Sequence, residues 1–179
     1  MRGRRINHKE STVPALEPIA AGDQIRRAFG HFPSGVTAVC AEIEGEKVGL
    51  AASSFTGVSL EPPLVSVCMQ HSSTTWPKLR LATRLGLSVL AEWQDAICGR
   101  LASKHGDRFA GTDVTVENDG SLFIDGASLW LDCTIYAELP CGDHDIVVLE
   151  VHGTGTGEDS PLVFHGSQFR RLAEVEAAL

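Results

Sequence analysis

The residues best suited to hold a reactive group lie in the segment 49–69, GLAASSFTGVSLEPPLVSVCM. It begins with a glycine and two alanines inside a run that otherwise has the composition of a β-strand. Small residues weaken a strand unless something must approach its backbone closely. Gly49, Ala51 and Ala52 would let a flat ligand reach the backbone amide and carbonyl groups, next to the hydroxyls of the serines that follow. A strand that crosses a crowded barrel corner would need the same small residues, and this alternative stays open.

A second candidate is the run HSSTTWP, residues 71–77, in which four hydroxyl-bearing residues stand directly before an expected helix. Free amides at a helix N-terminus and nearby hydroxyls bind anions, so the run predicts a phosphate site that includes Ser73. Arg100 and Lys104, near the end of the next expected helix, could neutralise the same phosphate. The alternative is an ordinary helix cap with spare serines.

His144 is the third candidate, because it follows a Gly-Asp turn and opens a strongly apolar strand. Its reference pKa lies near neutrality, so at a barrel rim it could bind a cofactor or tune a proton equilibrium. A histidine at the start of a strand is more often a surface or turn residue.

Motifs of hydrolytic catalysis are missing from the sequence: it has no G-x-S-x-G and no H-E-x-x-H. It also has no G-x-G-x-x-G after a strand and no Walker-type Gly-Lys-Ser/Thr. A bound cofactor that carries out its own chemistry, while the protein supplies position and shielding, is therefore the favoured interpretation.

The elements that must position these candidates are mostly short β-rich runs bounded by Gly, Pro or Asp. This order, without repeated βαβ units, predicts a mainly β protein, a Greek-key barrel with a few peripheral helices. Alternation of apolar residues from Leu129 to Ile135 predicts one buried strand face. Expected strands are 36–43, 47–55, 58–60, 64–69, 85–90, 121–124, 127–139, 144–157 and 161–166, and expected helices are 23–32, 74–83 and 92–104.

The sequence divides into an N-terminal arm and one domain. Residues 1–20 mix charges and prolines without an apolar period, which predicts an arm that is disordered or extended, ahead of a single domain over 21–179. In the helix expected at 23–32, Ile25, Ala28, Phe29 and Phe32 recur at spacings of three and four, so one face should cover the barrel.

Composition excludes several classes of protein. The 179 residues carry a formal net charge of −8, which would repel nucleic acid. The sequence has no apolar run long enough for a membrane helix and no signal peptide, so we expect a cytoplasmic protein without membrane contact. The five cysteines form no C-x-x-C pair and are expected as free thiols, buried except for Cys141. The seven histidines are scattered, so no metal site is expected.

Taken together, these segments resemble the flavin reductase family, the FMN-binding split-barrel proteins that serve as reductase components of two-component flavin-dependent monooxygenases. The resemblance spans about residues 23–172. It is carried by FGHFPSGVTAVCA, VGLAASSFTGVSLEPPLVSVCM, the Ser/Thr run before Trp76, LGLSVLAEWQ, DRFAG, CGDHDIVV and PLVFHGSQFRRL.

The resemblance implies an NAD(P)H-dependent flavin reductase, a homodimer that reduces FMN or FAD with NADH or NADPH and supplies reduced flavin to a partner monooxygenase. It implies that His144 faces the reacting rings and that Phe164, His165, Gly166 and Ser167 line the nicotinamide side. The flavin itself is expected at Val48, Gly49, Leu50, Ala51, Ser53, Ser54, Cys68, Met69, Gln70, Thr74, Thr75, Arg100 and Leu101, with Ser73 and Lys104 added from the phosphate argument above.

Three positions depart from the family pattern: Ser88 stands where many relatives have Asn, Glu150 where they have Gly, and Phe169 where they have Tyr. Phe169 keeps the stacking area and loses a hydroxyl. A non-catalytic carrier or sensor that binds flavin or haem on the same fold is the alternative function. An oxidase of the pyridoxamine-phosphate type is disfavoured because it needs a basic pocket and this chain has few Lys and Arg residues.

Overall fold

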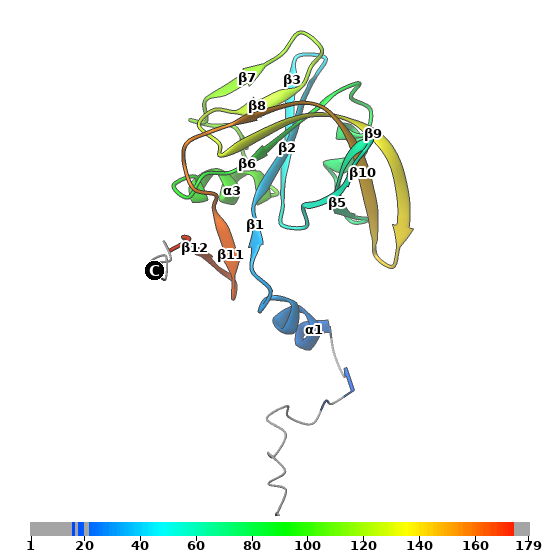
Figure 1. Ribbon diagram of the computed structural model, residues 1–179, viewed down its shortest axis with the longest axis vertical. Coiled ribbons are helices and arrows are strands. Elements are labelled where there is room, and N and C mark those ends of the chain that lie inside the picture. Colours follow the sequence, from blue (N-terminus) through cyan, green and yellow to red (C-terminus); the bar gives the residue numbers. More distant parts are fainter. Residues whose placement is uncertain (1–15, 17, 20–21, 174–179) are drawn as a thin grey trace, which may run out of the picture.

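The computed structural model describes residues 16, 18–19 and 22–173 of the chain. Seven strands form one antiparallel sheet that curls into a barrel (Figure 1), in the order β3-β2-β6-β9-β10-β5-β4. The chain makes the β2–β3 hairpin, crosses to β4–β5 at the other end of the sheet, and returns to place β6 beside β2. The strands are β2 (Thr37–Ile43), β3 (Glu46–Ala52), β4 (Thr56–Leu60), β5 (Pro63–Gln70), β6 (Leu85–Val89), β9 (Leu129–Cys141) and β10 (His144–Thr156). This is the mainly β, Greek-key architecture that the sequence predicts.

The long β9–β10 hairpin gives the sheet its curvature. Leu131 and Cys133 of β9 are buried in the barrel interior, as the alternation predicts. The register of β9 against β10 shifts between Val148 and Leu149 and again between Val151 and Gly153. Such β-bulges bend a strand and increase its twist, so they help the sheet to close on itself.

Two apolar clusters stabilise the molecule. The first fills the barrel and includes Val39, Val67 and Leu149, all fully buried. The second lies between the outer side of β2 and helix α3 (Asp95–Ala102), where Ile97 and Leu101 are buried. The prediction of an apolar helix face at 92–104 is thus confirmed in its centre, whereas Trp93 lies before the helix and is half exposed. A shorter helix, α2 (Trp76–Leu79), occupies the centre of the segment predicted as helix 74–83.

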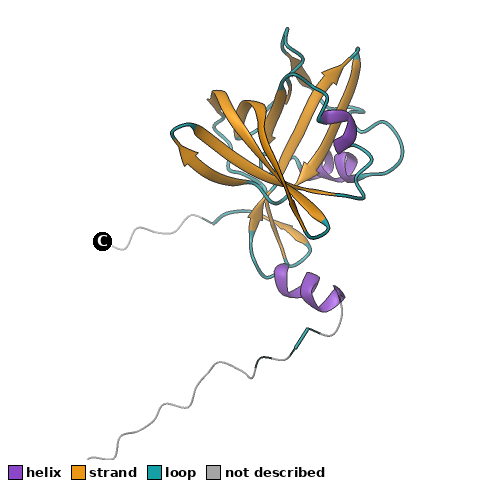
Figure 2. Cartoon of the chain, turned by 90° about the vertical axis from the view of Figure 1, so that its right-hand side faces the viewer, coloured by secondary structure: helices purple, strands orange, loops and turns teal. Residues whose placement is uncertain are grey.

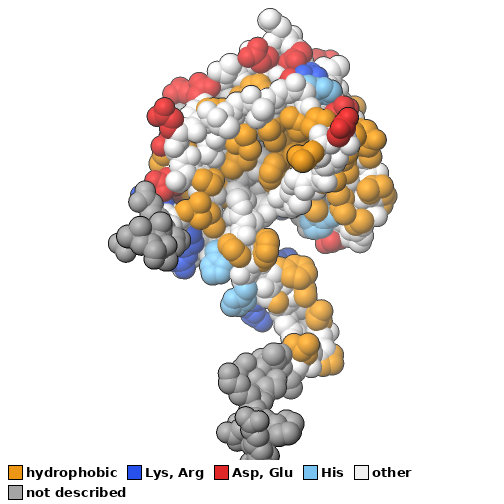
Figure 3. All heavy atoms as spheres, in the orientation of Figure 1, with side chains coloured by type: hydrophobic (Ala, Val, Ile, Leu, Met, Phe, Trp, Pro, Cys, Tyr) orange, Lys and Arg blue, Asp and Glu red, His pale blue; other side chains and the backbone are white. Residues whose placement is uncertain are grey.

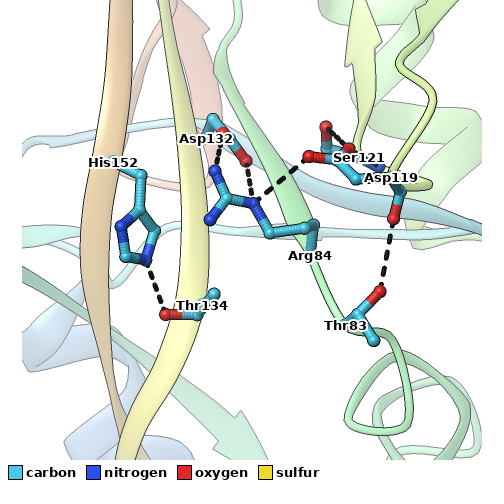
Figure 4. Close-up of polar contacts among 7 residues, drawn as sticks. All are labelled: Thr83, Arg84, Asp119, Ser121, Asp132, Thr134 and His152. Atoms are coloured by element: carbon cyan, nitrogen blue, oxygen red, sulfur yellow. Dashed lines mark hydrogen bonds and ion pairs between the residues drawn. The ribbon is translucent and has the colours of Figure 1, made fainter.

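A small hairpin of β7 (Val114–Val116) and β8 (Leu122–Ile124) lies across the barrel wall beside β2 and β6. Arg84, just before β6, contacts Asp132 of β9 and Asp119 of the β7–β8 turn, as Figure 4 shows. Asp119 in turn accepts a hydrogen bond from the Ser121 hydroxyl at 2.7 Å, which holds the pKa of this carboxyl below its usual range. One guanidinium therefore joins three segments that lie far apart in the sequence.

The N-terminal helix α1 (Gly22–Phe29) does not cover the barrel of its own chain, which corrects the prediction. It has no buried residue and leaves Phe29 and Phe32 largely exposed. Figure 2 shows α1 beyond a small sheet that projects from the barrel. That sheet consists of β1 (Ser34–Gly35), β11 (Val163–His165) and β12 (Gln168–Arg170). The chain leaves the barrel along β1, so α1 is carried away from the barrel wall. The predicted arm over residues 1–20 lies almost entirely outside the described residues.

The five cysteines are free thiols, as predicted, but their burial differs from the prediction. Cys40 and Cys133 are buried and Cys141 is exposed, whereas Cys68 and Cys98 are only partly buried. Within the described residues, no group of His, Cys, Asp or Glu could hold a metal ion. No helix in the same part of the chain is long and apolar enough to cross a membrane.

Candidate functional site

The barrel is split where edge strand β3 ends near the end of β5. An edge strand leaves every second pair of backbone amide and carbonyl groups free for other partners. Across the split, the Ser54 hydroxyl accepts a hydrogen bond from the Cys68 amide at 2.8 Å. The Ser54 hydroxyl therefore ties the two edges of the split together, in addition to lying beside any ligand there.

A groove of about 650 Å³ opens at this split. Its walls come from β3, β5, the loop 71–75, the end of α3 and the start of β10, so it brings together residues that the sequence suggested separately. The lining residues are Leu50, Ala51, Ala52, Ser53, Ser54, Cys68, Met69, Gln70, Ser72, Ser73, Thr74, Thr75, Leu101, Ala102, Lys104, Arg108 and His144. Ser72, Ala102 and Arg108 were not among the residues expected there.

Small residues of β3 have two different roles. Ala51 lines the groove, as expected. Gly49 faces the second apolar cluster instead, because a Cβ atom there would lie 2.7 Å from both Cys40 Sγ and Phe109 Cζ. The small size of Gly49 is thus required by packing, which was the open alternative, while its backbone still borders the site.

The hydroxyl-rich loop before α2 contains a helix cap and also lines the groove, while its role as a phosphate site stays a prediction. The Ser73 hydroxyl accepts hydrogen bonds from the amides of Thr75 at 3.3 Å and Trp76 at 3.1 Å, so it acts as a cap. Thr74 and Thr75 line the groove beside it. The cap holds the loop in place, and the Thr75 hydroxyl accepts a hydrogen bond from Arg108 in the wall of the groove.

Arg108 is the cation fixed at this end of the groove. Its Nη1 donates hydrogen bonds to the Gly49 carbonyl at 2.8 Å and to Thr75 Oγ1 at 2.6 Å. Lys104 also lines the groove. Arg100 does not line it, because its Nη2 donates to Thr112 Oγ1 at 3.0 Å. Arg108 belongs to the sequence motif DRFAG, but the motif alone does not show that the arginine side chain reaches the groove.

His144, at the start of β10, also lines the groove. Its Nδ1 is 2.7 Å from Asp143 Oδ1, and the pKa of the Asp143 carboxyl lies below its usual range because of this hydrogen bond. A second pair, His71 Nε2 and Asp145 Oδ1, lies at 2.9 Å nearby but does not line the groove. The imidazole of His144 is therefore oriented by a carboxylate while it stays accessible from the cavity.

Residues 164–167 lie outside the groove of the single chain. They form the end of β11 and the turn to β12, where Gly166 and Ser167 both have φ of 60°. Phe164 and Phe169 stack edge to face, with ring centroids 5.6 Å apart, so the phenylalanine at 169 packs within the hairpin. That residues 164–167 line the nicotinamide side of the site stays a prediction.

The groove fits a flavin in three respects. Its volume lies within the usual range for cofactor pockets. The edge of β3 supplies backbone groups of the kind that bind the polar rim of a heterocycle, beside small side chains that admit a flat ring. Arg108, Lys104 and the threonine hydroxyls supply cations and donors for a phosphate at one end.

Known proteins place the chain in a family. The family of flavin reductase like domains matches residues 29–173. A flavin reductase of Pseudomonas putida is 38% identical over 152 residues, which cover 84% of this chain and 89% of that protein. The reductase subunit HsaB of a flavin-dependent monooxygenase from Rhodococcus jostii (strain RHA1) is 34% identical over 82% of this chain and 75% of its own length.

A solved structure agrees in fold. The NADH:FAD oxidoreductase SgcE6 of Streptomyces globisporus C-1027, in complex with NAD and FAD fragments, matches with a TM-score of 0.82 at 33% identity, covering 91% of this chain and 99% of that one. The matching sequence spans the barrel and every wall of the groove. The chain belongs to the flavin reductase family.

Proposed function

We propose that this chain is an NAD(P)H-dependent flavin reductase that reduces FMN or FAD in the groove and releases the reduced flavin to a separate flavin-dependent monooxygenase. The observation that carries the proposal is the convergence, in one groove, of a free strand edge, a fixed arginine at Arg108 and an oriented imidazole at His144. Relatives named as a flavin reductase and as a reductase subunit support it.

Each part of the groove would have its own role. Backbone groups of residues 51–54 would bind the polar edge of the ring, where amide donors stabilise negative charge. Thr74, Thr75, Lys104 and Arg108 would bind the phosphate. His144 would lie beside the reacting face and help to orient the nicotinamide.

Flavin, when bound, supplies the hydride acceptor, and the reaction needs little more from the protein than placement. The rigid walls of the groove hold the reactants at contact distance, which lowers the barrier by orientation. NADH and FAD are favoured as the pair because SgcE6, which is similar to this chain over nearly its whole length, is an NADH:FAD oxidoreductase.

The active form would be a homodimer. Val58, Leu60, Tyr136 and Leu139 are large apolar residues that the single chain leaves more than half exposed, and so is Phe29 of α1. Figure 3 shows hydrophobic side chains gathered over the hollowed face between the barrel and α1. Soluble monomers rarely expose large contiguous apolar patches, so a second copy of the chain is the occupant we propose.

The test is anaerobic mixing of the purified protein with each combination of NADH or NADPH and FAD or FMN. Bleaching of the flavin absorbance band is expected, and its absence with every combination would reject the proposal. A carrier that binds flavin without reducing it would bind in titration and show no bleaching.

A variant separates turnover from binding. We expect His144→Asn to lower kcat about tenfold while the Kd for flavin stays within twofold, because the imidazole acts on the reaction and not on the phosphate end. His71→Asn is the matched control, since His71 forms a similar pair with an aspartate outside the groove. Equal losses in both variants would contradict the role given to His144.

A further inference from the structure

Residues 72–75 line the groove, and their positions depend on contacts with other parts of the barrel. They lie between the end of β5 and the start of helix α2. Helix α2 has four residues, and helices this short are not stable by themselves in water. The loop 71–75 and α2 must therefore be held by the strands around them.

The β9–β10 hairpin holds the loop at both ends. Before the residues that line the groove, the His71 amide donates a hydrogen bond to the Asp143 carbonyl at 2.9 Å. After them, the indole Nε1 of Trp76 donates to Oε1 of Glu138 at 3.1 Å. The first contact joins two backbone atoms, whereas the second depends on the side chain of Glu138.

Glu138 binds both ends of α2 with one carboxylate. Its Oε2 accepts a hydrogen bond from Arg80 Nη2 at 2.6 Å, directly after the last residue of the helix. Glu138 lies opposite Val147, which is fully buried in the barrel, and the Glu138 side chain is only 23% exposed. A carboxylate in such a position is stable when it accepts hydrogen bonds, and Trp76 and Arg80 supply them. Glu138 itself does not line the groove, so it can act on a bound ligand only through α2 and the loop.

Trp76 connects Glu138 to the groove. The Trp76 side chain packs in the barrel core and is 4% exposed, so removal of the carboxylate would leave a buried N–H without its acceptor, which is costly. The ring would then have to shift toward another acceptor or toward water. The Trp76 amide donates to Ser73 Oγ at 3.1 Å, and the residue before it, Thr75, lines the groove. A shift of the ring would therefore move the hydroxyls of the loop.

We propose that Glu138 is a positioning residue for flavin binding, which acts through Trp76 on the loop 71–75. The inference rests on the proposed function, because it takes the flavin to lie in the groove and to contact this loop. His144 is held separately, since it pairs with Gln70 of β5 in the sheet. Loss of the Glu138 carboxylate should therefore weaken flavin binding and leave the reaction of bound flavin unchanged.

The test measures binding and turnover of the same variants. We expect Glu138→Ala to raise the Kd and the KM for FAD about tenfold, the effect of losing one hydrogen bond to a charged group, while kcat at saturating FAD stays within about twofold of the unmodified value. Fluorescence titration of the full chain measures the Kd, and NADH oxidation measures kcat and KM. A loss of folded protein would instead lower kcat per chain and leave the Kd unchanged, and that result would overturn the inference.

Two further variants separate the contacts of Glu138. Glu138→Gln keeps an oxygen that accepts from the indole and loses the charge that pairs with Arg80, so the Kd for FAD should stay within about threefold of the unmodified value. Trp76→Phe removes the indole N–H, leaves the pair with Arg80 intact and should raise the Kd about fivefold. This comparison tests the inference even if Glu138→Ala does not fold, and the opposite order of the two Kd values would overturn it.

Asp132→Ala is the matched control on the same strand. Asp132 also pairs with an arginine, Arg84, has a side chain that is 24% exposed, and does not line the groove. Arg84 keeps its contact with Asp119, so the fold should be kept. The Kd for FAD should stay within about twofold, because a distant site acts independently, and a rise equal to that of Glu138→Ala would overturn the inference. Failure of the unmodified protein to bind either flavin would count against the proposed function itself.

Discussion

Two arginines near the groove differ in where their guanidinium groups point. Arg108 donates to the Gly49 carbonyl and to Thr75 Oγ1 in the wall of the groove. Arg100 donates to Thr112, and its Nε is buried with no hydrogen-bond partner among the described residues. We therefore expect Arg108, together with Lys104, to supply the positive charge for a phosphate in the groove.

We expect Arg108→Ala to raise the Kd for FMN about tenfold and the Kd for riboflavin less than twofold. Only FMN carries the phosphate, and a hydrogen bond to a charged group is worth about 1.5–3 kcal/mol, where about 1.4 kcal/mol corresponds to tenfold in Kd. Quenching of flavin fluorescence measures both constants. The riboflavin titration shows whether loss of the bonds to Gly49 and Thr75 has disturbed the ring site.

Arg100→Ala is the control for this prediction, because it removes an equal charge next to the groove wall at Leu101 and Ala102. The ratio of the two Kd values should stay as in the unmodified protein. If Arg100→Ala changed the ratio and Arg108→Ala did not, the phosphate would lie at the end of α3.

The reactivity of the cysteine thiols is a second property that depends on single residues. Burial raises the pKa of Cys40 to about 12 and that of Cys133 to about 12, so neither forms a thiolate at neutral pH. We expect Cys141, which is exposed, to react with a disulfide reagent in the native protein, and Cys40 and Cys133 to react only after unfolding. Peptide mapping by mass spectrometry assigns each label, and labelling of native Cys40 as fast as Cys141 would contradict the burial.

At the scale of elements, β6 and β8 approach each other through a glycine. A Cβ atom on Gly86 would lie 2.1 Å from the Leu122 carbonyl oxygen and 2.9 Å from its amide nitrogen, both backbone atoms that no side-chain rotation can move. The β7–β8 hairpin can therefore lie against the barrel wall only where β6 has no side chain. The buried Ser88 hydroxyl of the same strand accepts a hydrogen bond from the Ile124 amide at 3.0 Å.

Gly86→Ala should accordingly lower the free energy of unfolding by about 1–3 kcal/mol, the cost of forcing extra atoms into a packed site. Gly99→Ala is the opposite case, because this glycine lies within α3 with nothing near its Cβ position. It should raise the free energy of unfolding by about 0.5–1 kcal/mol. Urea denaturation of both variants measures the difference, and a Gly86→Ala protein as stable as the unmodified one would contradict the close approach.

Elements with a clear period could be predicted from the sequence, and those without one could not. Strand β9 was predicted because its apolar residues alternate, and a strand buried on one face produces that pattern. The strands β1, β7 and β12 are missing from the prediction because they have two or three residues and no run of consecutive apolar residues such as that of β8. The walls of the groove at β3 and the loop 71–75 could be predicted because they contain small and hydroxyl-bearing residues, and residue type can be read directly from the sequence. Arg108 was missed because the sequence does not reveal which of several cations turns toward the cavity.

The same limit applies to α1, where periodicity identified the apolar face and not its partner. Phe29 and Phe32 recur as they would on a buried helix, yet the structure leaves them exposed. Periodicity shows that one face of the helix is apolar and favours burial. Either the same chain or a second chain can bury that face.

At the scale of the whole molecule, the hollowed apolar face predicts the oligomeric state. We expect light scattering on a sizing column to give twice the chain mass. We expect Tyr136→Lys/Leu139→Lys to give a single chain, because burying unpaired lysine charges in an apolar interface is costly. Leu81→Lys, at a more exposed leucine after α2, should stay a dimer. An unmodified protein of single-chain mass, or a dimeric Tyr136→Lys/Leu139→Lys variant, would show that the exposed residues of β9 do not bind a second copy.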